Sequence, residues 1–146
     1  MNQQILQIPL KSQVLWVGIG CQRGISSQLI DQAIEKVFLE YQLADYAIAG
    51  FATIDAKASE VGLVEFCRLR SLPLKTFSAE SLRTVLVPNP AKIVQETTGT
   101  PSVAEAAAIL AVSECALEVK LLVPKQIFRL PGQAGTITVA VAQSVN

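Results

Sequence analysis

The chain has 146 residues, of which 51% are apolar and only 16% are charged, a composition that excludes a disordered protein and fits one core-rich domain. Twelve basic residues balance twelve acidic ones, so the chain has no excess positive charge with which to bind nucleic acid. No apolar run approaches the roughly 18 residues of a membrane span, and the first residues lack the layout of a signal peptide. We therefore expect a single cytoplasmic domain over residues 1–146 that contacts no membrane.

The sequence contains no histidine, which excludes every mechanism in which this chain supplies an imidazole as general base or metal ligand. The three cysteines, Cys21, Cys67 and Cys115, form no CxxC pair. This spacing fits neither a disulfide framework nor a thiolate zinc site. We expect free thiols, no bound metal and no cofactor.

The first half of the chain alternates short apolar runs with helical patterns. Residues 14–19 predict a buried strand, residues 29–41 a helix with one apolar stripe capped by Ser26 or Ser27, and residues 46–51 a second strand. Residues 61–70 then predict a second helix, residues 72–77 a short strand and residues 78–82 a brief helical segment. This alternation is typical of a strand–helix–strand arrangement with parallel strands.

The second half begins with a break at residues 88–90 and one or two predicted helical turns at residues 91–97. Ser102 and Glu105 have the spacing of a capping box, which predicts a helix beginning there. The alternating runs 119–123, 126–130 and 136–142 predict a closing β-hairpin, with Pro124 and residues 131–135 as the breaks. Together the elements predict a three-layer α/β/α domain with a mixed, mostly parallel sheet.

A glycine-rich loop follows the first predicted strand, where open α/β sheets hold their ligands. It contains Gly18, Gly20, Cys21, Arg23 and Gly24. The glycines let a ligand approach the backbone, the helix start favours an anion, and the arginine could bind a carboxylate or phosphate with two hydrogen bonds. The alternatives are a tight turn without a ligand, or a nucleotide or phosphometabolite site, although the GxGxxxG spacing is one residue longer than the dinucleotide fingerprint.

A charged cluster of Asp55, Lys57 and Glu60 precedes the second predicted helix. Lys57 could bind ligand carboxylates, and Glu60 or Lys57 could serve as an acid–base group, or as the base for a nucleophilic Cys21. The alternative is that Asp55 or Ser59 only caps the helix and that the thiol is a half-buried loop residue.

The start of the late helix offers a second pair of polar groups. Ser102 could donate a hydrogen bond to a ligand and Glu105 could act in acid–base catalysis. The alternative, which the regular spacing favours, is that the two residues form only a capping box.

Four segments in this order resemble the cobalamin-biosynthesis family called CobE, or the C-terminal domain of CbiG. They are GIGCQRG, ATIDAKASEVGL, GTPSVAEAAA and a TVAVA strand at the end. The family pattern usually places two basic residues after GxGC, whereas Gln22 takes the first of these places here. The resemblance covers nearly the whole chain.

This resemblance implies an α/β/α fold and a role in handling corrin-ring intermediates. In full-length CbiG the implied activity is hydrolysis of cobalt-precorrin-5A, which opens a ring lactone and releases acetaldehyde. The N-terminal and central regions of CbiG have no counterpart here, so a separate chain or other cobalamin-pathway enzymes would be the partners. Zero net charge in a half-apolar domain also favours self-association.

On this hypothesis the helix starts near Gly24, Ser59 and Ser102 meet at one sheet edge and surround a precorrin. The expected ligand-binding residues are Gly18, Gly20, Cys21, Arg23, Gly24, Lys57 and Ser102, and the expected acid–base residues are Glu60, Lys57 and Glu105.

Overall fold

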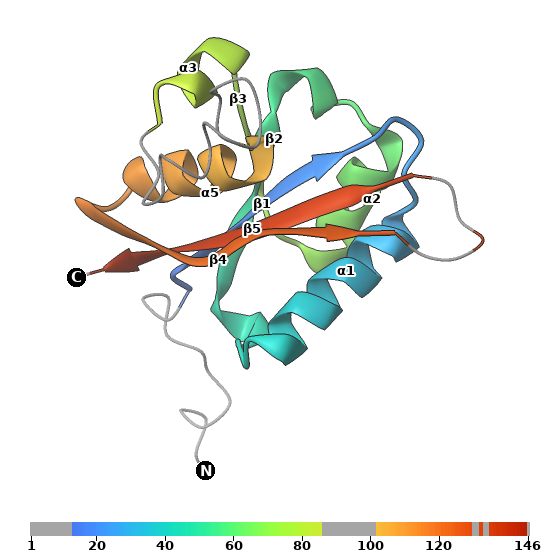
Figure 1. Cartoon of the computed structure of the whole chain (residues 1–146), viewed down its shortest axis with the longest axis horizontal. Coiled ribbons are helices and arrows are strands. Elements are labelled where there is room, and N and C mark those ends of the chain that lie inside the picture. The colour runs from blue at the N-terminus through green and yellow to red at the C-terminus, as the bar shows by residue number, and fades with distance from the viewer. Residues whose placement is uncertain (1–12, 86–101, 130–131, 133–134, 146) are drawn as a thin grey trace.

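A computed structural model describes residues 13–85, 102–129, 132 and 135–145. Its centre is a five-stranded sheet in the order β3-β2-β1-β5-β4 (Figure 1). β1, β2 and β3 pair in parallel, whereas β5 pairs antiparallel with both β1 and β4, so β5 alone among the described strands runs in the opposite direction. The strands are β1 (Leu15–Cys21), β2 (Ile48–Ile54), β3 (Leu74–Phe77), β4 (Glu118–Phe128) and β5 (Ile137–Val145).

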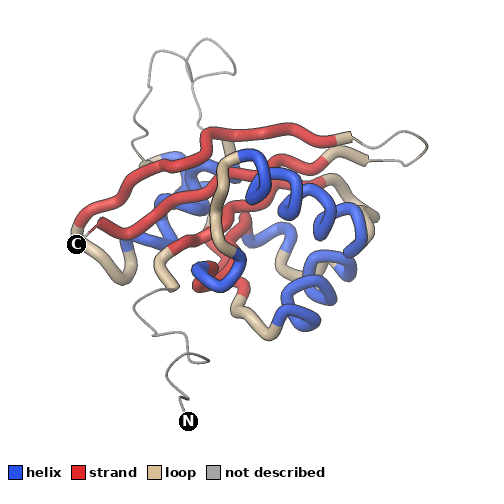
Figure 2. Tube along the Cα trace, turned by 90° about the horizontal axis from the view of Figure 1, so that it is seen from below, coloured by secondary structure: helices blue, strands red, loops and turns tan. Residues whose placement is uncertain are grey.

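Helices cover both faces of the sheet, which confirms the predicted three-layer α/β/α fold. The helices are α1 (Ser27–Glu40), α2 (Val61–Arg70), α3 (Ala79–Arg83) and α5 (Val103–Ser113). α1 and α2 lie on one face, whereas α3 and α5 lie on the other (Figure 1). β4 and β5 run side by side as the predicted C-terminal hairpin (Figure 2). Within the described ranges, no helix has the length and apolar character that crossing a bilayer requires.

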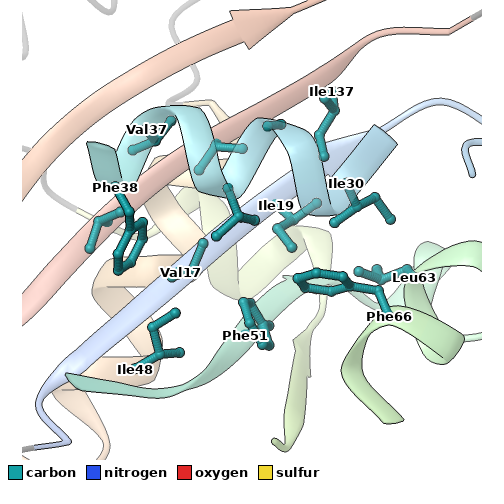
Figure 3. Packing of buried hydrophobic residues seen from close by; sticks show 14 of the residues in the cluster. Val17, Ile19, Ile30, Val37, Phe38, Ile48, Phe51, Leu63, Phe66 and Ile137 are labelled. Carbon is teal, nitrogen blue, oxygen red and sulfur yellow. The ribbon is translucent and has the colours of Figure 1, made fainter. Parts of the chain in front are cut away.

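The larger core lies between the sheet and the α1–α2 layer. Val17 and Ile19 of β1 point into it and are fully buried (Figure 3). Phe51 of β2 meets Phe66 of α2 edge to face, with ring centroids 4.9 Å apart. The predicted apolar stripe of α1 is confirmed, and its buried residues are Leu29, Ile30, Ala33, Ile34, Val37 and Phe38.

The second core, on the opposite face, depends on small residues. α5 is buried on nearly all sides, and five of its 11 residues are alanines. A Cβ atom on Gly18 would overlap the carbonyl oxygen of Ala104, so glycine is required where α5 crosses β1. At the other end of α5, Lys75 Nζ lies 3.0 Å from Glu114 Oε1 and 4.4 Å from the centroid of the Trp16 ring. These contacts hold α5 closely against the sheet from end to end.

Two boundaries differ from the sequence-based expectation. Residues 45–47 form a 3-10 turn, so β2 begins at Ile48 rather than Tyr46. Pro124 does not separate two strands, because β4 is continuous and its pairing with β5 shifts register between Val123 and Gln126. β4 is the edge strand, where a bulge accommodates the missing N–H of proline. The turns predicted at residues 91–97 lie outside the described residues.

The contact at Gly18 predicts a sharp difference between two glycines of the same strand. Gly18→Ala should lower the free energy of unfolding by about 1–3 kcal/mol or more, because the new methyl group displaces α5. Gly20→Ala is the matched control, since the nearest atom to its Cβ position is 3.7 Å away. Urea denaturation of the two variants measures the difference, and equal stabilities would contradict the proposed packing.

Candidate functional site at the carboxyl edge of β1 and β2

The loop between β1 and α1 turns the chain from the sheet into the first helix. Cys21 is half-buried at the end of β1, whereas Arg23 and Gly24 are exposed. Gly24 has a φ of +82°, in the left-handed region that favours glycine. Ser26 Oγ accepts a hydrogen bond from the Leu29 amide at 3.0 Å, which confirms the predicted cap of α1. The loop therefore needs both Gly24 and Ser26 for its shape.

α2 holds this loop on one side. The amide of Gly24 donates a hydrogen bond to Glu60 Oε1 at 2.6 Å. A Cβ atom on Gly62 would overlap the carbonyl oxygen of Ile25, so the first turn of α2 lies directly against the loop. The Gly24 amide, which the sequence suggested for a ligand anion, therefore already donates to a carboxylate of the chain itself.

The segment between β2 and α2 begins with the 3-10 turn η4 (Asp55–Lys57). Glu60 is the N-cap residue of α2, but its side chain makes no capping bond because the carboxylate is directed at Gly24. The alternative that Asp55 or Ser59 caps α2 is therefore wrong. Lys57, half-buried in η4, remains a candidate for binding a ligand.

Cys21 lies within the electrostatic reach of this segment. Burial raises the pKa of the Cys21 thiol above its ordinary value; the Lys57 ammonium opposes the increase, and the Glu60 carboxylate adds to it. The neutral thiol therefore predominates at neutral pH, which favours a half-buried loop thiol over a nucleophile.

Ser102 caps α5, as the spacing predicted, and the Glu105 carboxylate bonds to the Ser102 hydroxyl rather than to its backbone amide. Ser102 Oγ accepts a hydrogen bond from the Glu105 amide at 3.1 Å and donates one to Glu105 Oε1 at 3.2 Å. The other carboxylate oxygen, Oε2, accepts the amide of Lys125 from β4 at 3.0 Å. Glu105 is only 8% exposed, so this carboxylate joins α5 to β4 and is poorly placed for acid–base work on a ligand.

The glycines of β1 differ in their surroundings. Gly18 is buried beneath α5, so its backbone is not open to a ligand. A Cβ atom on Gly20 would lie 3.9 Å from the Cβ atom of Val103, the first residue of α5. α5 therefore begins beside the carboxyl end of β1, while α1 and α2 begin after β1 and β2 (Figure 1). The three predicted helix starts lie at one edge of the sheet, two on one face and one on the other.

Thr136, the residue before β5, holds the loop on its other side, in a contact that the sequence did not predict. The Gln22 amide donates to the Thr136 carbonyl at 3.3 Å, and the Thr136 amide donates to Gln22 Oε1 at 3.1 Å. Arg129 Nε donates to Thr136 Oγ1 at 3.3 Å. Gln22 and Thr136 are 114 residues apart, so no local pattern could have predicted the pair.

Two cations at this edge have no described partner. In the part of the chain that the structure describes, the ion pairs are Arg68 with Glu65, Arg70 with Asp31, and Lys75 with Glu114. Neither Arg23 nor Lys57 forms an ion pair or a side-chain hydrogen bond with another described residue. The described residues also include no cluster of three or more acidic or thiol side chains that could hold a metal ion.

The fold and this edge define a class of protein: a three-layer α/β domain with its polar loops at the carboxyl ends of parallel strands, where such domains hold small ligands. Residues 15–142 match the family described as "Cobalamin synthesis G C-terminus", and the chain belongs to that family. It is a cobalamin biosynthesis protein related to the C-terminal domain of cobalt-precorrin-5A hydrolase.

Individual relatives agree with this assignment. The cobalt-precorrin-5A hydrolase of Priestia megaterium is 31% identical over 132 residues, which are 90% of this chain but only 33% of that protein. The structure of CobE, a protein from the cobalamin (vitamin B12) biosynthetic pathway, covers 91% of this chain and 95% of its own, with a TM-score of 0.71 and 26% identity. The cobalamin biosynthesis protein chiG from Agrobacterium tumefaciens strain C58 covers 91% of this chain and 100% of its own, with a TM-score of 0.67 and 29% identity. The resemblance drawn from the sequence is confirmed.

The three thiols should react at different rates with iodoacetamide. Cys115 is exposed and should be alkylated first, whereas burial raises the pKa of Cys67 to about 12. Because burial also raises the pKa of Cys21, its alkylation should accelerate only as the pH rises above the ordinary thiol range. Mass spectrometry of a Cys115→Ser variant follows Cys21 directly, and rapid alkylation of Cys21 at pH 7 would contradict its raised pKa.

The Glu60 carboxylate should protect the amide of Gly24 from hydrogen exchange. In Glu60→Ala we expect this amide to exchange about tenfold faster, the equivalent of losing one hydrogen bond. Glu60→Gln keeps an acceptor oxygen and should lie in between. Glu65→Ala removes a carboxylate one turn further along α2 and should leave Gly24 unaffected. NMR exchange measurements compare the variants, and unchanged exchange in Glu60→Ala would disprove the contact.

Proposed function

We propose that this chain binds corrin-ring intermediates, the precorrins, at the carboxyl edge of β1 and β2. The family match and the relative named for cobalt-precorrin-5A support this ligand class. A precorrin carries acetate and propionate carboxylates around an apolar macrocycle. Its receptor therefore needs several separated cationic groups at one edge, rather than a single anion pocket.

The observation that carries the proposal is a pair of cations at this edge that have no ion-pair partner among the described residues. Arg23 projects from the β1–α1 loop and Lys57 from η4, next to Cys21. The β1–α1 loop is held from both sides, by Glu60 and by Thr136. A loop that is already ordered loses little conformational freedom on binding, which favours affinity for a large ligand.

The alternative function, nucleotide or phosphometabolite binding through the glycine loop, is disfavoured by the same geometry. A phosphate at the helix start would need the Gly24 amide, which already donates to the Glu60 carboxylate. The phosphate would therefore have to displace a fixed negative charge or lie beside it. A ligand with carboxylates spread around a ring can reach Arg23 and Lys57 without entering that position.

Hydrolysis of the precorrin lactone is proposed to need residues beyond the 146 of this chain. The chain spans 33% of the length of the hydrolase it matches. Glu105 is engaged at both of its oxygens and Glu60 at one, so of these two carboxylates only Glu60 keeps an oxygen without a partner among the described residues. We therefore assign ligand binding to this domain and catalysis to its combination with the remaining two thirds of the hydrolase, supplied by a separate chain. The domain alone should release no acetaldehyde, and adding that partner should restore the release.

An absorbance titration with a late corrin intermediate tests the binding function. The wild-type protein should show a saturable spectral change that NADP does not compete away. Lys57→Ala and Arg23→Ala should each weaken binding by about tenfold or more, the usual effect of losing one charge-assisted hydrogen bond. Arg68→Ala, which removes an exposed cation from the far end of α2, is the matched control.

The titration also identifies failure. Absence of corrinoid binding together with binding of NADP would overturn the proposed function in favour of the nucleotide alternative. Normal binding by Lys57→Ala and Arg23→Ala would remove these two residues from the site while leaving the ligand class intact.

A further inference from the structure

The ends of β1, β5 and β4 continue as a polar row beyond the paired strands. Cys21, Ile137 and Phe128 form the last paired row, and all three pack toward the α1–α2 core. The next residues along these segments are Gln22, Thr136 and Arg129, joined by the hydrogen bonds described above. This second row therefore lies just beyond the carboxyl ends of β1 and β4, at the edge that carries the β1–α1 loop.

Hydrogen bonds to Thr136 fix the orientation of the Gln22 and Arg129 side chains. A backbone N–H can only donate, so the oxygen of the Gln22 amide group faces Thr136 and its NH₂ group points away. Arg129 uses Nε on the hydroxyl of Thr136, which leaves the two terminal nitrogens of the guanidinium directed outward. Among the described residues, none accepts a hydrogen bond from these remaining N–H groups.

We propose that Arg129, with the Gln22 amide beside it, binds a carboxylate of the ligand at this edge of the sheet. A guanidinium held at Nε presents its terminal N–H groups in the geometry that matches a carboxylate. This inference rests on the proposed function and extends it, because nothing in the sequence pattern singled out Arg129 or Thr136.

The position of this subsite also defines how a ligand would lie. Lys57 follows β2, whereas Arg129 follows β4, and β1 and β5 lie between these two strands. The carboxylate nearest to the loop, Glu60, is already bonded to Gly24. A flat macrocycle lying across the edge of the sheet would therefore place some of its carboxylates near Lys57 and others near Arg129. A small monocarboxylate could use only one of these cations.

The test compares two corrins that differ only in charge: one with free carboxylates and one with the same groups converted to neutral amides. Arg129→Gln should weaken binding of the carboxylated corrin by about tenfold and leave binding of the amidated corrin nearly unchanged. Thr136→Val, which removes the hydroxyl that orients Arg129, should produce part of this loss, and Thr136→Ser should restore binding. Arg68→Gln serves as the control for loss of one exposed positive charge.

The outcomes separate this inference from the function on which it rests. The subsite is overturned if Arg129→Gln weakens binding of both corrins equally, or of neither. In either case Lys57→Ala still tests the proposed function. If the wild-type protein binds neither corrin, both proposals fail. Thermal unfolding of each variant should match the wild type, since Gln22 and Arg129 are exposed and Thr136 is only partly buried.

Discussion

The carbonyl oxygen of Ala104 in α5 occupies the place where a side chain on Gly18 would be. This approach requires small residues on both partners, and α5 supplies them with fully buried alanines at positions 106, 107, 108 and 111. α5 starts only one residue before this contact, so its first turn is held beside Gly20. Gly18 in β1 thus determines where α5 begins, and α5 is the third helix that starts at the carboxyl edge.

The loop that follows β1 is held by parts of the chain that are distant in sequence. Gly62 lets α2 lie against Ile25, and the Cδ1 atom of the same isoleucine lies 3.0 Å from the Cβ position of Gly135 on the other side. Gly135 has a φ of +104°, so glycine is required there for its backbone as well. Polar contacts from Glu60 and Thr136 complete the frame. The shape of this loop therefore depends on parts of the chain that meet only in the folded domain.

The sequence predicts much of the fold, because helices and strands leave periodic patterns over a few residues. The apolar spacing of α1, the Ser26 cap and the Ser102 cap were all recognisable in this way. The same local reasoning misplaced the break at Pro124, because a proline in an edge strand and a proline between strands look alike until the pairing is known.

The candidate site was harder to predict, since its residues meet through tertiary contacts. Gly18 looked like part of a ligand loop, but the helix that covers it comes more than eighty residues later. Glu60 looked like a free acid, whereas it is bonded to an amide 36 residues away. Arg129 had no local signal, because its orientation depends on a threonine that only the β4–β5 pairing brings near. The charges of a site can be listed from sequence, but which of them remain unpaired depends on the fold.

The bulge at Pro124 has a consequence for the behaviour of the protein at high concentration. An edge strand of eleven residues, such as β4, ordinarily offers a template on which another strand can add. Here Pro124 has no N–H to offer, and the amide of Lys125 is turned inward to Glu105. The outer row of hydrogen-bonding groups is therefore interrupted at the middle of the strand. Addition of a strand from another molecule, the first step toward fibrils, is therefore disfavoured along the β4 edge.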